Sequence, residues 1–214
     1  MEGPPKQYLY HMVPKDMRPN EEGKNILYPL NMLKEKFPDL YEVKAEKYLE
    51  PQGSNEEKNK DRKSIPERLI PTLEQAAWGD ALNLTAIHPQ DLINALESAG
   101  FSPKEMKFYQ IDPELLDSKL TTVYLYKEEV SEQEDSKQYV DFDSKKLHEY
   151  KAIPDETKTY YKKRFEEQKR PLLFVRVPHI LYKKHLDVSD VEQFPVITVF
   201  PTKKETSDPR ASKT

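Results

Sequence analysis

His11 is the residue of this chain whose setting most invites a chemical role. It stands between Tyr10 and Met12 in an aromatic segment, and an imidazole titrates near neutral pH. If the segment is a strand, Tyr10 and Met12 share one face and His11 points to the other. A neutral imidazole there can donate one hydrogen bond and accept another, which suits a ligand hydroxyl and a backbone carbonyl equally well. We favour a half-buried histidine bonded to main chain and keep ligand contact as the alternative.

Aromatic and acidic residues elsewhere could complete a pocket around His11. Trp78 could form a wall and Asp80 could supply a polar group, although a lone tryptophan more often anchors a core and an aspartate after glycine often belongs to a turn. Tyr28 and Tyr48 belong to a tyrosine-rich first part of the chain. Their rings could stack on a base or a nicotinamide, or pack within a sheet. The candidate ligand-binding residues are therefore His11, Tyr28, Tyr48, Trp78 and Asp80, and no catalytic residue is assigned.

Several common chemistries lack the residues they need. The chain has 5 glycines and none after Gly100, whereas a phosphate-binding loop requires clustered glycines. It has 0 cysteines, which removes disulfides, thiol catalysis and zinc–thiolate sites. His179 and His185 are the only histidines close in sequence, and their spacing suits no usual zinc pair. We therefore predict no metal site and no resident cofactor.

Charge and hydropathy restrict the partners. The formal net charge is −4, so no overall field attracts nucleic acid or anionic lipid. Apolar runs are only a few residues long, far below the ~18 of a membrane helix, and the first residues show no secretory signal. We expect no nucleic-acid or membrane partner, and a location in the cytoplasm or secretion by a signal-independent route.

Basic residues gather late in the chain. Glu166 and Glu167 accompany them in the same segment, and a solvated helix face is the simplest interpretation of such mixed charge. The basic residues are Lys158, Lys162, Lys163, Arg164, Lys169 and Arg170.

Alternating and helical patterns are intermixed along the chain, which predicts a soluble α+β fold with a mixed or antiparallel sheet and helices packed on it. We expect one domain over residues 1–202, with a flexible insertion at 50–63 and a disordered tail at 203–214. Strands are expected at 7–13, 107–111, 120–127, 138–142, 171–177 and 194–200, and helices near 31–37, 40–48 and 154–167. The clearest helix signal follows His88, because Pro89 occupies the first turn, Leu92 and Leu96 lie on one apolar face, and Gly100 follows the end.

Short phrases of the sequence carry a family resemblance. The segments 8–14 (YLYHMVP), 27–31 (LYPLN) and 78–80 (WGD), with His88-Pro89, resemble a family of small bacterial proteins without an established activity. The arrangement is also similar to the ADP-ribosyltransferase fold, in which a histidine or arginine ending the first strand holds the NAD ribose. That resemblance implies this role for His11. The fold also implies a late strand with a catalytic glutamate, whereas residues 173–177 contain Arg176 and no acid.

Two functions remain open. The first is a protein-interaction module without catalysis, which uses the aromatic sheet face and charged loops to bind another protein. The second is an NAD- or nucleotide-binding protein, similar to ADP-ribosyltransferases, with His11 in a sheet-lined pocket. The sequence leaves open whether the protein is an enzyme, and we favour the first.

Overall fold

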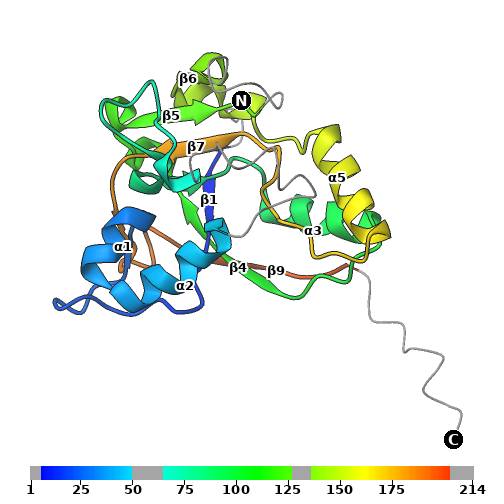
Figure 1. The fold of residues 1–214 in the computed structure, drawn as a ribbon, viewed down its shortest axis with the longest axis horizontal. Coiled ribbons are helices and arrows are strands. Elements are labelled where there is room, and N and C mark those ends of the chain that lie inside the picture. The colour runs from blue at the N-terminus through cyan, green and yellow to red at the C-terminus, as the bar shows by residue number, and fades with distance from the viewer. Residues whose placement is uncertain (1–5, 50–64, 127–135, 203–214) are drawn as a thin grey trace, which may run out of the picture.

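Antiparallel strands from both halves of the chain form the centre of the computed structural model, which describes residues 6–49, 65–126 and 136–202 (Figure 1). A three-stranded sheet has the order β1-β4-β9, and a four-stranded sheet has the order β3-β7-β5-β6. A third sheet pairs β2 with β8. The strands are β1 (Leu9–Met12), β2 (Ile26–Leu27), β3 (Leu82–Leu84), β4 (Met106–Ile111), β5 (Thr121–Tyr124), β6 (Tyr139–Asp141), β7 (His179–Tyr182), β8 (Leu186–Asp187) and β9 (Val196–Val199).

A β-bridge between Tyr10 and Thr85 joins the two larger sheets. The amide of Tyr10 donates to the Thr85 carbonyl (2.8 Å), and the amide of Thr85 donates to the Tyr10 carbonyl (3.1 Å). Thr85 directly follows β3, so β1 is hydrogen-bonded both to its own sheet and to the end of a strand of the other sheet. His11 is therefore fixed on a strand at the centre of the molecule.

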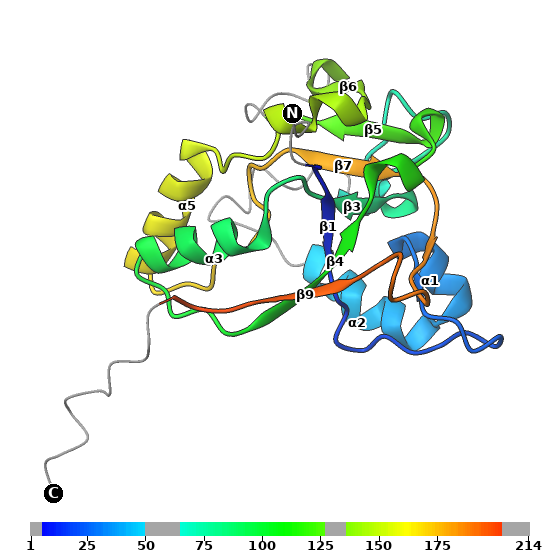
Figure 2. The same ribbon diagram turned by 180° about the vertical axis from the view of Figure 1, so that it is seen from behind.

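Helices flank the sheets at two ends. The helices α1 (Leu30–Lys36) and α2 (Pro38–Leu49) pack together at one end, and α3 (Pro89–Ser98) and α5 (Asp155–Glu166) lie side by side at the other (Figures 1 and 2). The single compact domain of helices and antiparallel sheets confirms the α+β prediction. Short 3-10 helices occupy Ile65–Glu67, Trp78–Asp80, Pro113–Leu115, Ser118–Leu120, Ser136–Gln138 and Ser144–Glu149.

Successive side chains of β1 point to opposite faces, as expected for a strand, and therefore pack in two different parts of the core. Leu9 is fully buried and packs with residues of both sheets, among them Leu84, Ile111 and Ile180. Tyr10 faces the opposite side, where it packs with residues including Ile93 of α3. His11 therefore shares the face of Leu9, and its partner across the ladder is Tyr109 of β4.

The helix α3 follows from local signals. The His88 side chain accepts a hydrogen bond from the amide of Gln90, and Pro89 occupies the first turn. Gly100 adopts a φ of +105°, and the next amide, that of Phe101, donates to the Leu96 carbonyl (3.1 Å). This is the closing pattern that glycine permits past a helix end. The predicted helix is confirmed.

The strand predicted at residues 171–177 is wrong. This segment is irregular, because side chains of α5 bond the backbone groups that a neighbouring strand would otherwise pair. Thr157 donates to the carbonyls of residues 175 and 176, Tyr161 donates to that of residue 173, and the Tyr160 hydroxyl accepts from the amide of residue 172. Arg176 has a φ of +57°, which no strand residue adopts. We call this segment, residues 171–177, the clamped segment.

β9 borders the three-stranded sheet, and one side chain covers part of its open edge. The amide of Gln110 donates to the Pro195 carbonyl (2.8 Å), so the alternate residues, including Phe200, direct their backbone groups away from β4. The amide group of Gln90 bonds both groups of Phe200: its nitrogen donates to the carbonyl (2.9 Å) and its oxygen accepts from the N–H (3.4 Å). Gln90 thus replaces a neighbouring strand at this position.

Most other predicted elements appear at shifted bounds. The strands expected at 7–13, 107–111, 120–127, 138–142 and 194–200 correspond to β1, β4, β5, β6 and β9, and the helices expected at 31–37, 40–48 and 154–167 correspond to α1, α2 and α5. The flexible insertion predicted at 50–63 and the disordered tail predicted at 203–214 lie outside the described residues.

Candidate functional site

His11 is half-buried on β1 and bonds to its own strand. Its Nδ1 lies 2.7 Å from the Met12 carbonyl oxygen. Burial is the largest influence on the imidazole and lowers the pKa of His11 to about 4; the bond to Met12 opposes this shift, and the nearby charge of Lys44 on α2 reinforces it. His11 is therefore neutral at pH 7. Because a carbonyl only accepts, Nδ1 carries the proton and Nε2 is left as an acceptor.

Trp78 belongs to an aromatic cluster on the four-stranded sheet. Its indole N–H donates to the Tyr139 hydroxyl (2.7 Å), and its ring meets those of Tyr124 and His179 edge-on at 5.3 Å and 5.5 Å. Burial lowers the pKa of His179 to about 4, against an opposing bond to the Phe174 backbone. These contacts are those of an aromatic anchor packed against a sheet.

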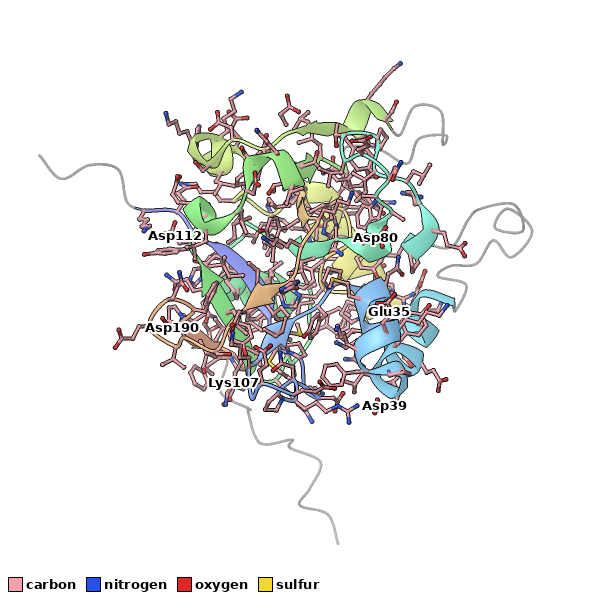
Figure 3. All side chains as sticks on the ribbon, turned by 90° about the vertical axis from the view of Figure 1, so that its left-hand side faces the viewer. Glu35, Asp39, Asp80, Lys107, Asp112 and Asp190 are labelled. Carbon is pink, nitrogen blue, oxygen red and sulfur yellow. The ribbon has the colours of Figure 1, made fainter. Side chains whose placement is uncertain are left out.

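Asp80 ties a turn to the first helix. One carboxylate oxygen accepts from the Asn31 side chain of α1 (2.8 Å), and the other accepts from the amide of Ala77 (2.8 Å). A side chain at Gly79 would meet the Asn31 oxygen at 2.5 Å, so glycine allows this close approach. Figure 3 shows Asp80 beside α1, the helix from which Glu35 projects. Both carboxylate oxygens of Asp80 therefore have protein partners.

The two predicted tyrosines lie near the same helices. The Tyr28 ring packs against Phe37 (6.1 Å between centroids) and His185 (5.8 Å). Tyr48 falls within α2, and its side chain lies outside the described residues.

The structure brings only some of the predicted site residues together. Trp78 and Asp80 share one 3-10 turn, and Asn31 connects that turn to the helix that follows Tyr28. The described contacts of His11 and those of Trp78 have no residue in common. A pocket formed jointly by the five residues stays a prediction.

Within residues 6–49, 65–126 and 136–202, no group of three or more histidine, aspartate or glutamate side chains could hold a metal ion. The helices in those ranges are too short or too polar to cross a bilayer.

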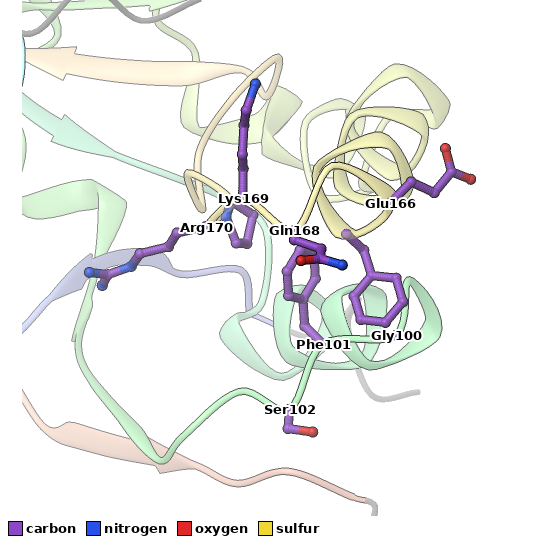
Figure 4. A pocket seen from close by; sticks show the side chains of 9 residues that line it. Gly100, Phe101, Ser102, Glu166, Gln168, Lys169 and Arg170 are labelled. Carbon is purple, nitrogen blue, oxygen red and sulfur yellow. The ribbon is translucent and has the colours of Figure 1, made fainter.

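An open hollow lies where α3 and α5 end, away from all five predicted residues. Its volume is about 680 Å³. Figure 4 shows Phe101 and Gln168 among the side chains that line it, with Lys169 and Arg170 extending away from them in different directions. The lining residues are Gly100, Phe101, Ser102, Phe165, Glu166, Gln168, Lys169, Arg170 and Pro171.

The two helices end in the same way, and these endings shape the hollow. Gln168 has a φ of +54°, and the amide of Lys169 donates to the Arg164 carbonyl (2.9 Å), as Gly100 and Phe101 do at the end of α3. In both helices a residue of positive φ is followed by an amide that bonds back into the last turn. The chain therefore turns away from each helix axis at the hollow.

Phe165 and Phe101 form the apolar floor of this hollow. Their rings meet edge-on, with centroids 5.3 Å apart and an interplanar angle of 84°. A Cβ at Gly100 would lie 2.7 Å from the Phe165 ring, so any other residue there would require the ring to shift. Phe165 nevertheless remains 45% exposed. The Phe165 ring is thus held in place by packing against Phe101 and still exposes a surface that a ligand can contact.

Basic side chains are concentrated along the end of α5 beside the hollow; two of them, Lys169 and Arg170, line it together with the carboxylate of Glu166. Residues 162–170 contain five basic side chains and two carboxylates, and most of them are exposed. Lys169, Lys163 and Arg164 all approach Glu167, at 3.3, 3.9 and 3.9 Å. One carboxylate thus faces three cations, and the rim keeps a positive surplus.

Sequence reasoning identified this charged segment but not the hollow. The available signals were Phe165 on a charged helix and Phe101 directly after a helix-ending glycine. Neither shows that the two rings meet.

The chain matches no protein-family model, no curated protein and no solved structure. The resemblances to a family of small bacterial proteins and to the ADP-ribosyltransferase fold stay predictions. Function is accordingly argued from the site itself, since a fold does not determine an activity.

Proposed function

We propose that this protein is a protein-interaction module that binds a segment of another protein in the hollow between the ends of α3 and α5. The observation that carries this proposal is the exposed aromatic floor: Phe165, 45% exposed, rests on Gly100 and against Phe101 inside a concave surface. Accessible aromatic residues in a concave surface are typical of binding hot spots, where a few side chains contribute most of the binding energy.

Rigidity of the hollow supports the same proposal. The ends of α3 and α5 are closed by backbone hydrogen bonds, and Thr157, Tyr160 and Tyr161 fix the clamped segment that leads away from the rim. A surface held in its binding conformation loses less entropy when a ligand is bound.

The test is selection of peptides from a displayed random library on the full-length chain. Selected peptides should bind in solution and lose at least tenfold in affinity to Phe165→Ala, because truncating a central aromatic anchor removes ~2 kcal/mol or more. Leu172→Ala is the matched control, since Leu172 is 42% exposed and lies outside the lining of the hollow. Melting temperatures of both variants establish that they fold. Failure to select any binder, or binders indifferent to Phe165→Ala, would refute the proposal.

Nucleotide binding through His11 is the alternative function. It retains support from the unprotonated Nε2 acceptor on β1, which a ribose hydroxyl could use. A ligand that binds the native state raises its melting temperature. A rise with NAD that His11→Ala abolishes would favour this alternative over the peptide-binding proposal.

A further inference from the structure

The charge of the rim and the chemistry of the floor restrict which segment the hollow can take. This step rests on the proposed function and specifies the partner. Phe165 and Phe101 offer two ring surfaces, which a polar side chain cannot cover without losing its hydration. The segment bound there must therefore insert an aromatic or long aliphatic side chain.

The surplus of basic side chains at the rim determines which charge the residues beside the anchor should carry. Glu167 is shared by Lys163, Arg164 and Lys169, while no ion pair among the described residues engages Lys162 or Arg170. Arg170 and Lys169 project from the rim in Figure 4. Carboxylates beside the anchor would meet cations on the same rim, which is the complementarity that selects partners.

Two opposing charges must be weighed against these cations. Each helix end carries roughly half a negative charge, and both α3 and α5 end at the hollow. The returning amides of Phe101 and Lys169 already bond carbonyls of these last turns, and five basic side chains against two carboxylates exceed the sum of the two helix ends. The segment 162–170 therefore keeps a surplus of positive charge beside the hollow.

The rest of the chain is acidic overall, which disfavours large anionic ligands. The whole chain carries −4, and the positive surplus of residues 162–170 means that the remainder is more acidic still. A flat anionic surface or a long polyanion would contact that remainder as well, whereas a short segment seated in the hollow would not.

We infer that the hollow binds a short acidic segment of a partner protein that carries one aromatic or long aliphatic anchor side chain. The anchor contacts Phe101 and Phe165, and the flanking carboxylates face Lys169 and Arg170.

The test measures the affinity of fluorescent peptides for the full chain by anisotropy. One peptide has a central phenylalanine with aspartate flanks; others have glutamine flanks, lysine flanks, or aspartate flanks around a central alanine. We expect the first to bind most tightly, with losses of about tenfold for glutamine flanks and for the alanine centre. Salt should weaken the first peptide most, because the Debye length falls from ~10 Å at 0.1 M to ~3 Å at 1 M.

Reversing the charges of Lys169 and Arg170 tests whether the peptide binds at the hollow. The double variant Lys169→Glu with Arg170→Glu should lose at least tenfold for the aspartate-flanked peptide. The double variant Lys145→Glu with Lys146→Glu makes the same change in net charge at exposed residues of another element, Ser144–Glu149, and should bind like the wild type.

The outcomes separate this inference from the proposed function. If neutral or basic peptides bind the hollow as tightly as the acidic one, the partner chemistry is overturned and the interaction module stands. If no peptide of the set binds, the inference fails, and the library selection with Phe165→Ala decides the proposed function independently. Binding of phosphatidylserine vesicles or of a single-stranded oligonucleotide that the Lys169→Glu, Arg170→Glu variant abolishes would overturn the inference in favour of another anion.

Discussion

Replacing Thr157 by valine should loosen the clamped segment next to the hollow. Thr157 is fully buried on α5, and its hydroxyl donates to the carbonyls of Val175 (3.1 Å) and Arg176 (2.9 Å). Valine has the same shape, so the substitution removes the hydrogen bond without opening a cavity. Arg176 also has a φ of +57°, a strained conformation that its surroundings must maintain.

The expected loss in the free energy of unfolding depends on the carbonyl groups that lose their hydrogen-bond donor. A buried polar group without a partner costs about 1–3 kcal/mol. One hydroxyl hydrogen is shared here between two carbonyls of half-buried residues, so we expect a loss of about 1–2 kcal/mol. With an m value of about 1–3 kcal/mol/M for urea, a loss of ~1.5 kcal/mol lowers the unfolding midpoint by roughly 0.5–1.5 M.

Urea denaturation followed by circular dichroism measures this difference. Thr159→Val is the matched control, because Thr159 is exposed on the same helix and the substitution has the same intrinsic effect on helix formation. Amide hydrogen exchange should accelerate in residues 171–177 of Thr157→Val only. If the two variants differ by less than ~0.5 kcal/mol, the range of ordinary surface substitutions, the clamp does not stabilise the protein as argued.

Two further predictions concern the core and the pH response. Leu92→Ala and Leu96→Ala should each lose about 2–5 kcal/mol in the free energy of unfolding, since both side chains are buried; a melting curve within 1 °C of wild type would contradict their placement. Burial holds the pKa of His11 and His179 at about 4 in the folded chain, below the ordinary 6.5 or so, so the unfolded chain binds more protons between these values. Stability should therefore be full above pH ~6.5 and decline as the pH falls towards 4, and His179→Gln or His11→Gln should flatten that decline in urea titrations at successive pH values.

The sequence could predict α3 because every signal for that helix is local. The cap at His88, the proline after it, the apolar positions and Gly100 all lie within one stretch, and each acts on its nearest neighbours. The segment 171–177 has the apolar residues of a strand, yet its backbone partners are side chains of α5. No periodicity in the segment itself reports a partner supplied by another element, and for that reason its irregular conformation could not be foreseen.

The same distinction applies to the candidate sites. The charge run near Phe165 and the aromatic Phe101 are visible in the sequence, but the sequence does not show that the Phe165 ring packs onto Gly100 and against Phe101. The predicted site around His11 groups residues only by the chemistry of their side chains. Chemical type alone does not determine that Trp78 packs with Tyr139 and His179 while His11 bonds to Met12.

The amide of Gln90 has a consequence for copies of this protein at high concentration. The border strand of a sheet offers its backbone groups to any extended chain, and strand addition of this kind starts aggregation. Both groups of Phe200 are already bonded to Gln90, so an incoming strand must displace a side chain that is tethered beside it and competes at high effective concentration. In the described part of β9, the open edge is reduced to Val196 and Thr198. One glutamine on a neighbouring helix therefore shortens the template on which a second copy could grow a continuous sheet.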